Sequence, residues 1–241
     1  MSLREHVMTP DPQRTQRTPE ADWIRELFDH DEQHGASWYW VTLMPKTTAY
    51  PTLSTKERDR STATVTDADL IQNTARQTVR LVKTAIHNTL TEVDPRHSRS
   101  NPERTGANAR IAVLVVPALA KRTTTSSKRD ARVLHFHGWI ILNHTTTPDP
   151  MRTIRITKDD APTRVLLPLS VARLVEHLQD AFGPNVFCSS TPETTAPPEG
   201  AASVDAHIGY ACRQSATETT FPRDVLAVPH WYWSARHPSP K

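Results

Sequence analysis

Residues 133–142 read Val-Leu-His-Phe-His-Gly-Trp-Ile-Ile-Leu, an apolar run that contains two histidines. Its branched and aromatic residues favour a β-strand. Because alternate residues of a strand face the same side, His135 and His137 would point toward one place. Two neutral imidazoles there could hold a divalent metal ion, although an isolated pair at this spacing is equally consistent with histidines that only pack in a core or on a sheet surface.

A second apolar run precedes the histidine run. Residues 111–116 read Ile-Ala-Val-Leu-Val-Val, and Pro117 follows them. We expect a buried central strand that ends at this proline and pairs with the histidine strand as an antiparallel hairpin. The segment between the two runs is basic and contains Lys121, Arg122, Lys128, Arg129 and Arg132.

The other elements are predicted from apolar periodicity and turn residues. Apolar residues at helical spacing indicate a long amphipathic helix from Thr66 to Val93 and a second helix that Ser170 caps and Gly183 ends. Strands are expected over residues 38–44 and 185–188, helices over 21–28 and 203–216, and edge strands or an inserted hairpin over 153–157 and 164–167. This order predicts an α+β fold in which helices flank an antiparallel central sheet.

The length of 241 residues suits one domain with extensions. Residues 1–20 are polar and contain prolines, so we expect a disordered arm, then one folded domain over residues 21–220 and an irregular tail over 221–241. No stretch is apolar over the roughly 20 residues that a membrane span needs, and no signal-peptide core precedes the domain. We therefore expect a cytoplasmic protein with no membrane partner.

Composition narrows the function classes. The formal net charge of +3 permits a nucleic-acid partner without requiring one. Six glycines leave no glycine-rich phosphate loop, so an ATP-driven motor is not expected, and neither is a small-molecule cofactor. Cys188 and Cys212 lack the paired spacing of a cysteine zinc site and do not suggest a disulfide framework.

The last expected helix carries a phenol among other functional groups. His207, Arg213 and Gln214 stand at offsets of −3, +3 and +4 from Tyr210, so all four would share one helix face. A tyrosine on a helix is more often a packing residue with its hydroxyl at the rim. In combination with the histidine strand, this face suggests a tyrosine nucleophile beside a metal site.

The three features together resemble the HUH endonucleases, whose hallmark of histidine, hydrophobic residue and histidine stands here as His135-Phe136-His137. Replication initiators of that class have an earlier strand that Trp40-Val41-Thr42-Leu43 resembles, and a later tyrosine helix that residues 208–213 (Ile-Gly-Tyr-Ala-Cys-Arg) resemble. The motifs span residues 38–214. Their order is that of an initiator or a single-tyrosine transposase, whereas relaxases usually place the tyrosine first.

The resemblance implies a ferredoxin- or RRM-like palm as the fold and a DNA-nicking activity. Single-stranded DNA at an origin hairpin would be nicked and rejoined through a 5′-phosphotyrosine intermediate, which would initiate rolling-circle replication of a plasmid or phage. The free 3′ hydroxyl would prime synthesis. Because the chain has no phosphate loop, a host helicase would unwind the duplex.

The resemblance also assigns roles to residues. Tyr210 would be the nucleophile, with help from Arg213, and His135 and His137 would bind Mg²⁺ or Mn²⁺. The third ligand would be Gln214, with His207 as the second candidate and Glu103 as a distant third. DNA phosphates would contact Lys121, Arg122, Lys128, Arg129 and Arg132. Trp40 would stack on a base, as could Trp38 and Trp139. The alternative for the basic residues is a charged turn that is only solvated. The alternative for the tryptophans is a place in the core, where strand tryptophans usually lie.

Other readings remain open. A single-tyrosine transposase would use the same chemistry at paired element ends. A non-catalytic origin-binding protein could share the fold with a structural Tyr210. Cupins and amidohydrolases also contain the histidine spacing, although the few glycines and the modest length fit neither class well.

Overall fold

A computed structural model describes residues 19–44, 49–50, 67–93, 111–122, 131–143, 149–158, 161–184, 186–199 and 201–212. Its helices are α1 (Pro19–Gln33), α3 (Asp67–Val93), α4 (Leu169–Phe182) and α5 (Val204–Cys212). Its strands are β1 (Ser37–Leu43), β2 (Ala49–Tyr50), β3 (Ile111–Arg122), β4 (Ala131–Leu142), β5 (Met151–Lys158), β6 (Ala161–Pro168) and β7 (Val186–Cys188). All pairs between the described strands are antiparallel, which confirms the α+β class.

Most of the expected arm and all of the expected tail lie outside the described residues, whereas Pro19 and Glu20, expected in the arm, begin α1. Residues 1–18 and 213–241 lie outside the described residues, so the domain boundaries stay predictions. Within the described ranges, no helix has both the length and the apolar character needed to cross a membrane.

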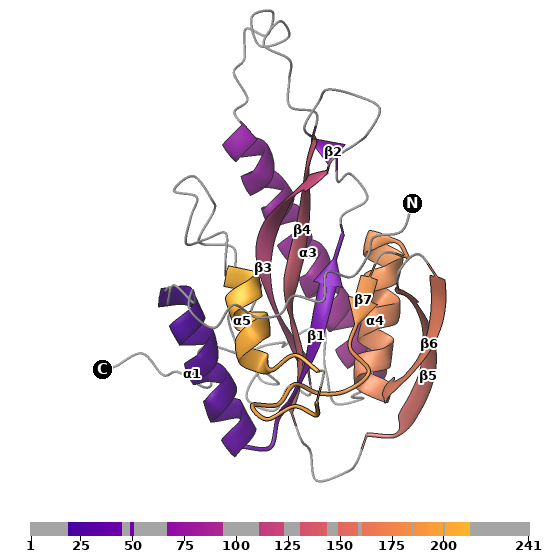
Figure 1. The fold of residues 1–241 in the computed structure, drawn as a ribbon. Coiled ribbons are helices and arrows are strands. Elements are labelled where there is room, and N and C mark those ends of the chain that lie inside the picture. Colours follow the sequence, from indigo (N-terminus) through magenta and orange to yellow (C-terminus); the bar gives the residue numbers. More distant parts are fainter. Residues whose placement is uncertain are drawn as a thin grey trace, which may run out of the picture.

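The centre of the main sheet is β4. It pairs with β1 and β2 along one edge and with β3 along the other, and β7 continues the sheet beyond β1 (Figure 1). Among the described strands β3 pairs only with β4, so the expectation that residues 111–116 form a central strand is wrong. Its apolar sequence has another cause, because side chains on both of its faces are buried.

The strand β3 also continues through Pro117, where we expected it to end. Pro117 lies opposite Phe136 in an unbroken register that runs from Ile111 to Arg122. A proline has no N–H for a sheet ladder, and an edge strand tolerates this loss because one of its sides is unpaired. The longer strand places Lys121 opposite Arg132.

The main sheet separates two hydrophobic cores. One core lies against α3, α4 and the β5–β6 hairpin, and the other lies against α1 and α5 (Figure 1). Because side chains alternate along a strand, Phe136 and Ile140 of β4 belong to the first core, whereas Trp139 and Ile141 belong to the second. The two histidines of β4 share the alternation of Trp139 and therefore face the α1–α5 side.

Gly138 marks a close approach between β3 and β4. A Cβ atom at this position would lie 1.9 Å from the carbonyl oxygen of Leu114 and 2.7 Å from the Cα of Val115. Both neighbours are backbone atoms of a paired strand, so they cannot move aside without disturbing the ladder. We expect Gly138→Ala to lower the free energy of unfolding by about 3 kcal/mol. Urea denaturation would measure this loss, and an unchanged midpoint would contradict the close approach.

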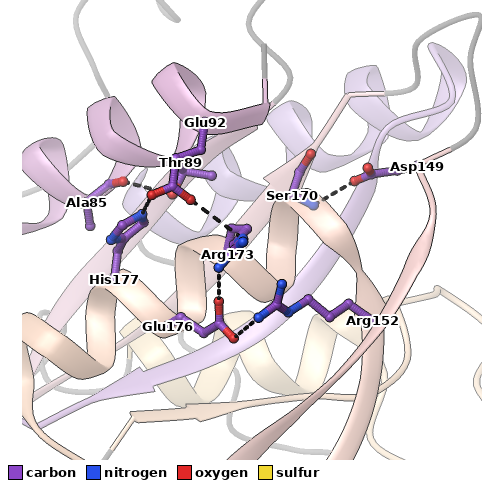
Figure 2. Close-up of polar contacts among 9 residues, drawn as sticks. All are labelled: Ala85, Thr89, Glu92, Asp149, Arg152, Ser170, Arg173, Glu176 and His177. Atoms are coloured by element: carbon purple, nitrogen blue, oxygen red, sulfur yellow. Dashed lines mark hydrogen bonds and ion pairs between the residues drawn. The ribbon is translucent and has the colours of Figure 1, made fainter. Parts of the chain in front are cut away.

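The hairpin expected over residues 153–167 is present as β5 and β6, and α4 follows it. The expected cap of α4 is wrong, because Pro168 occupies the N-cap position and makes no side-chain hydrogen bond. Instead, the Ser170 N–H donates to the Asp149 carboxylate at 2.8 Å (Figure 2). Gly183, with φ of 90°, ends the helix as expected.

Charged side chains connect α3, α4 and β5. Glu176 accepts from Arg152 at 2.9 Å and from Arg173 at 3.0 Å (Figure 2). Glu92 of α3 lies 3.1 Å from the Nε2 of His177 and 3.6 Å from the Nε of Arg173. Each pair is partly exposed and contributes little stability alone. As a network, they fix the hairpin and both helices as one unit on the sheet face opposite the histidines.

Candidate active site

His135 and His137 lie side by side on β4, as their spacing predicted. The two residues are 8% and 6% exposed, and their ring centroids are 4.5 Å apart in an edge-to-face arrangement. Both belong to the sheet face that α1 and α5 cover. The two imidazoles therefore converge at one buried position.

The two ring nitrogens of His137 have different surroundings. Nδ1 lies 3.2 Å from the Oγ1 of Thr42, which is opposite it on β1. Nε2 is buried and has no hydrogen-bond partner among the described residues. A buried polar atom without a partner costs about 1–3 kcal/mol, so a ligand on Nε2 would offset this loss.

The protonation state of His137 suits such a ligand. Burial, followed by the charges of His135 and His207, lowers the pKa of His137 to about 3. The ring is therefore neutral at physiological pH. When Nδ1–H donates to Thr42, Nε2 carries a free lone pair, which is the form in which histidine binds a metal ion.

Helix α5 brings Tyr210 to the histidines. The Oγ of Ser203 accepts the Ala206 N–H at 3.3 Å, so the helix begins where the sequence predicted. An ion pair between Arg25 and Asp205 joins α5 to α1. The Tyr210 ring centroid lies 4.7 Å from that of His137, and the residue is 41% exposed. The phenol is thus next to the buried histidines and open to solvent.

Glu193 belongs to the site, although the sequence did not indicate it. The segment after β7 runs along β1, where the Glu193 N–H donates to the carbonyl oxygen of Trp38 at 2.6 Å. One Oε of Glu193 lies 2.8 Å from the Nδ1 of His207, and the Glu193 side chain is 4% exposed. The segment after β7 is rich in proline and threonine and has no helical or strand periodicity. The position of the Glu193 carboxylate therefore became apparent only from the structure.

The Trp40 ring contacts both His137 of β4 and His207 of α5. Its ring stacks on His207 with centroids 4.3 Å apart and lies 5.3 Å from that of His137. The residue is 7% exposed, so stacking on a DNA base would require His207 or Tyr210 to move, and this role stays a prediction. Trp38 and Trp139 are 1% and 0% exposed, and the suggestion that they stack on bases is wrong because both are core residues.

The third metal ligand stays a prediction. In the described part of the chain, no group of three His, Cys, Asp or Glu side chains could hold a metal ion by itself. His207 contacts Glu193 and Trp40. Gln214 and Arg213 follow the last described residue of α5, and Glu103 also lies outside the described residues. The two histidines of β4, with the free Nε2 lone pair, fit a divalent ion as the first two of its ligands.

The two described ends of the basic segment lie at one end of the β3–β4 ladder. The register places Lys121 opposite Arg132 and Arg122 opposite Ala131. Lys128 and Arg129 lie outside the described residues. Lys121, Arg122 and Arg132 thus belong to the ladder of the strand that carries the histidines, and the contacts of all five cations with DNA stay predictions.

No protein-family model, curated protein or solved structure matches the chain. The function is therefore inferred from the site itself.

Proposed function

We propose that the chain is an endonuclease of the HUH class with a ferredoxin- or RRM-like palm. It would nick and rejoin single-stranded DNA at an origin hairpin, as an initiator of plasmid or phage rolling-circle replication does, with a host helicase to unwind the duplex. The observation that carries the proposal is the buried Nε2 of His137, which has no partner among the described residues, with the ring of Tyr210 only 4.7 Å from the His137 ring. The proposed nucleophile and a proposed metal ligand are thereby adjacent.

The chemistry proposed for Tyr210 is a transfer between two phosphate esters. The phenol oxygen bonds to the phosphorus of the scissile phosphodiester, and the bond from phosphorus to the 3′ oxygen breaks. The phenol proton is lost, and the departing 3′ oxygen gains a proton to become a hydroxyl. The 5′ phosphate remains on Tyr210, and attack by a 3′ hydroxyl reverses the reaction without ATP.

The surroundings of Tyr210 support this role. A protonated phenol is a poor nucleophile, so Tyr210 would need cationic help, which Arg213 would provide. His135 and His137 would hold Mg²⁺ or Mn²⁺, and the ion would offset the negative charge of the phosphate oxygens. Two imidazole donors match Mn²⁺ better than Mg²⁺. Thr42 would orient the His137 ring through Nδ1.

Trapping the covalent intermediate tests the proposal. The full chain would be incubated with a pool of single-stranded oligonucleotides and Mn²⁺, then denatured and separated. We expect a protein band that carries DNA, and peptide mass spectrometry should place the DNA on Tyr210. Sequencing the attached strand would define the nick site. DNA binding without any adduct across a well-sampled pool would indicate a non-catalytic origin-binding protein, and paired cleavage at two element ends would indicate a transposase.

A further inference from the structure

Two arginines lie directly opposite each other on the β5–β6 hairpin. The register pairs Arg155 with Arg164, and both residues are exposed. Opposite residues of an antiparallel pair share a face with Cβ atoms about 4.5–5.5 Å apart, where like charges destabilise the pairing. Among the described residues, no carboxylate forms an ion pair with either guanidinium. No ion pair among the described residues therefore offsets this repulsion.

The hairpin presents these arginines on a fixed outer face. Its inner face buries Ile154, Ile156 and Leu167 in the core that α3 and α4 also line. The Gln179 side chain of α4 donates to the carbonyl oxygen of Arg155 at 2.9 Å. Figure 1 shows the hairpin at the edge of the molecule beside α4. Its outer face therefore cannot turn inward to hide the two charges.

The rest of the outer face suits DNA. Thr153 lies opposite Leu166 on it, and Met151 belongs to the same face at the base of the hairpin. Met151 and Leu166 are 57% and 52% exposed, which makes them two of the exposed large apolar residues of the described chain. Threonine hydroxyls bind phosphates, and apolar side chains contact the methyl groups of thymine in the major groove. No described residue of this face is acidic.

We propose that the outer face of the β5–β6 hairpin binds double-stranded DNA, with Arg155 and Arg164 on its phosphates. A two-stranded ribbon fits the major groove, and guanidinium groups bind phosphates with two hydrogen bonds each. This inference rests on the proposed function, because an enzyme that nicks at an origin hairpin must also hold the duplex stem. The hairpin and Tyr210 lie on opposite sides of the main sheet, so the duplex would not compete with the single strand at the tyrosine.

Salt-dependent binding tests this surface. The double variant Arg155→Ala/Arg164→Ala would be made in a Tyr210→Phe chain, so that no cleavage disturbs the measurement. Fluorescence anisotropy with a short labelled duplex gives the affinity at several salt concentrations. Each lost phosphate contact should lower the slope of log affinity against log salt by about 0.9, hence by about 1.8 for the pair. If the two chains bind equally at 1 M salt, a slope difference of about 1.8 corresponds to an affinity loss of about 60-fold at 0.1 M salt.

A charge-matched control separates the hairpin from general charge. Arg76→Ala/Arg80→Ala removes the same two charges from exposed positions of α3 and should leave the slope unchanged. The hairpin variant should unfold at the same or a higher temperature, because it removes like-charge repulsion. An unchanged slope in the hairpin variant, or an equal loss in the α3 variant, would overturn the proposal. Since binding is measured without cleavage, a missing covalent adduct would count against Tyr210 alone.

Discussion

Tyr210→Phe is expected to remove the covalent protein–DNA adduct and to lower the rate of strand cleavage by on the order of 10⁴-fold or more. The reason is chemical, because phenylalanine lacks the oxygen that would bond to phosphorus. The ring itself can keep its contacts with His137 and Trp40. Tyr210 is 41% exposed, so the substitution does not change a fully buried core position. Gel separation after denaturation measures the adduct, and a thermal melt checks the fold.

The matched control is Tyr39→Phe. Tyr39 lies on the neighbouring strand β1 but belongs to the opposite core, and it is 6% exposed. Burial, followed by the charges of Cys188 and Asp149, raises the pKa of its phenol, so it is even less suited to act as a nucleophile. This variant should retain the adduct. If Tyr210→Phe formed the adduct as well as the wild type does, Tyr210 would not be the nucleophile and the proposed mechanism would fail.

Local patterns predicted most of the described elements. Apolar spacing located α3 and α4 to within a few residues, and branched and aromatic residues located β1 and β4. Alternation along β4 placed both histidines on one face. These predictions succeeded because helical and strand periods depend on neighbours in the chain, which the sequence shows directly.

Predictions that depend on strand order were less successful. The run Ile111–Val116 is apolar on both faces, which is typical of a central strand, yet β3 pairs only with β4 in the described sheet. Helices cover both faces of β3 and explain its apolar residues without a second partner strand. Pro117 then causes no break, because the missing N–H can face the unpaired edge. Burial therefore specifies the environment of a strand and not its position in the sheet.

The candidate site was predictable only where residues share one element. The spacing within β4 and within α5 indicated the histidines and the tyrosine, and folding brings these two elements together. Thr42 and Glu193 reach the site across strand pairs and through a loop. Such contacts depend on register and path, which no local pattern encodes. Arg213 and Gln214 lie outside the described residues, so their roles stay predictions.

His137→Leu should abolish metal binding without greatly destabilising the metal-free protein. Leucine fills a similar volume and removes the buried Nε2 that has no partner in the described structure. The variant also loses the contact between Nδ1 and Thr42, which offsets the gain from removing Nε2, so we expect the free energy of unfolding without metal to change by less than about 1 kcal/mol. In the wild type, Mn²⁺ at about 100 times its dissociation constant should add about 2.7 kcal/mol, and the variant should lose this gain. Urea denaturation with excess chelator and with Mn²⁺ measures both quantities.

His177→Leu is the matched control, because it removes a histidine that already has a partner. The Nε2 of His177 lies 3.1 Å from Glu92 on the other side of the sheet. This variant should lose little stability without metal, because the pair is partly exposed, and it should keep the full gain from Mn²⁺. The two variants thus differ in the expected gain from Mn²⁺, because the Nε2 of His177 already has a carboxylate partner, whereas the Nε2 of His137 has none among the described residues. If His137→Leu kept the Mn²⁺ gain, the ion would bind elsewhere, and the free Nε2 would be only a local packing cost.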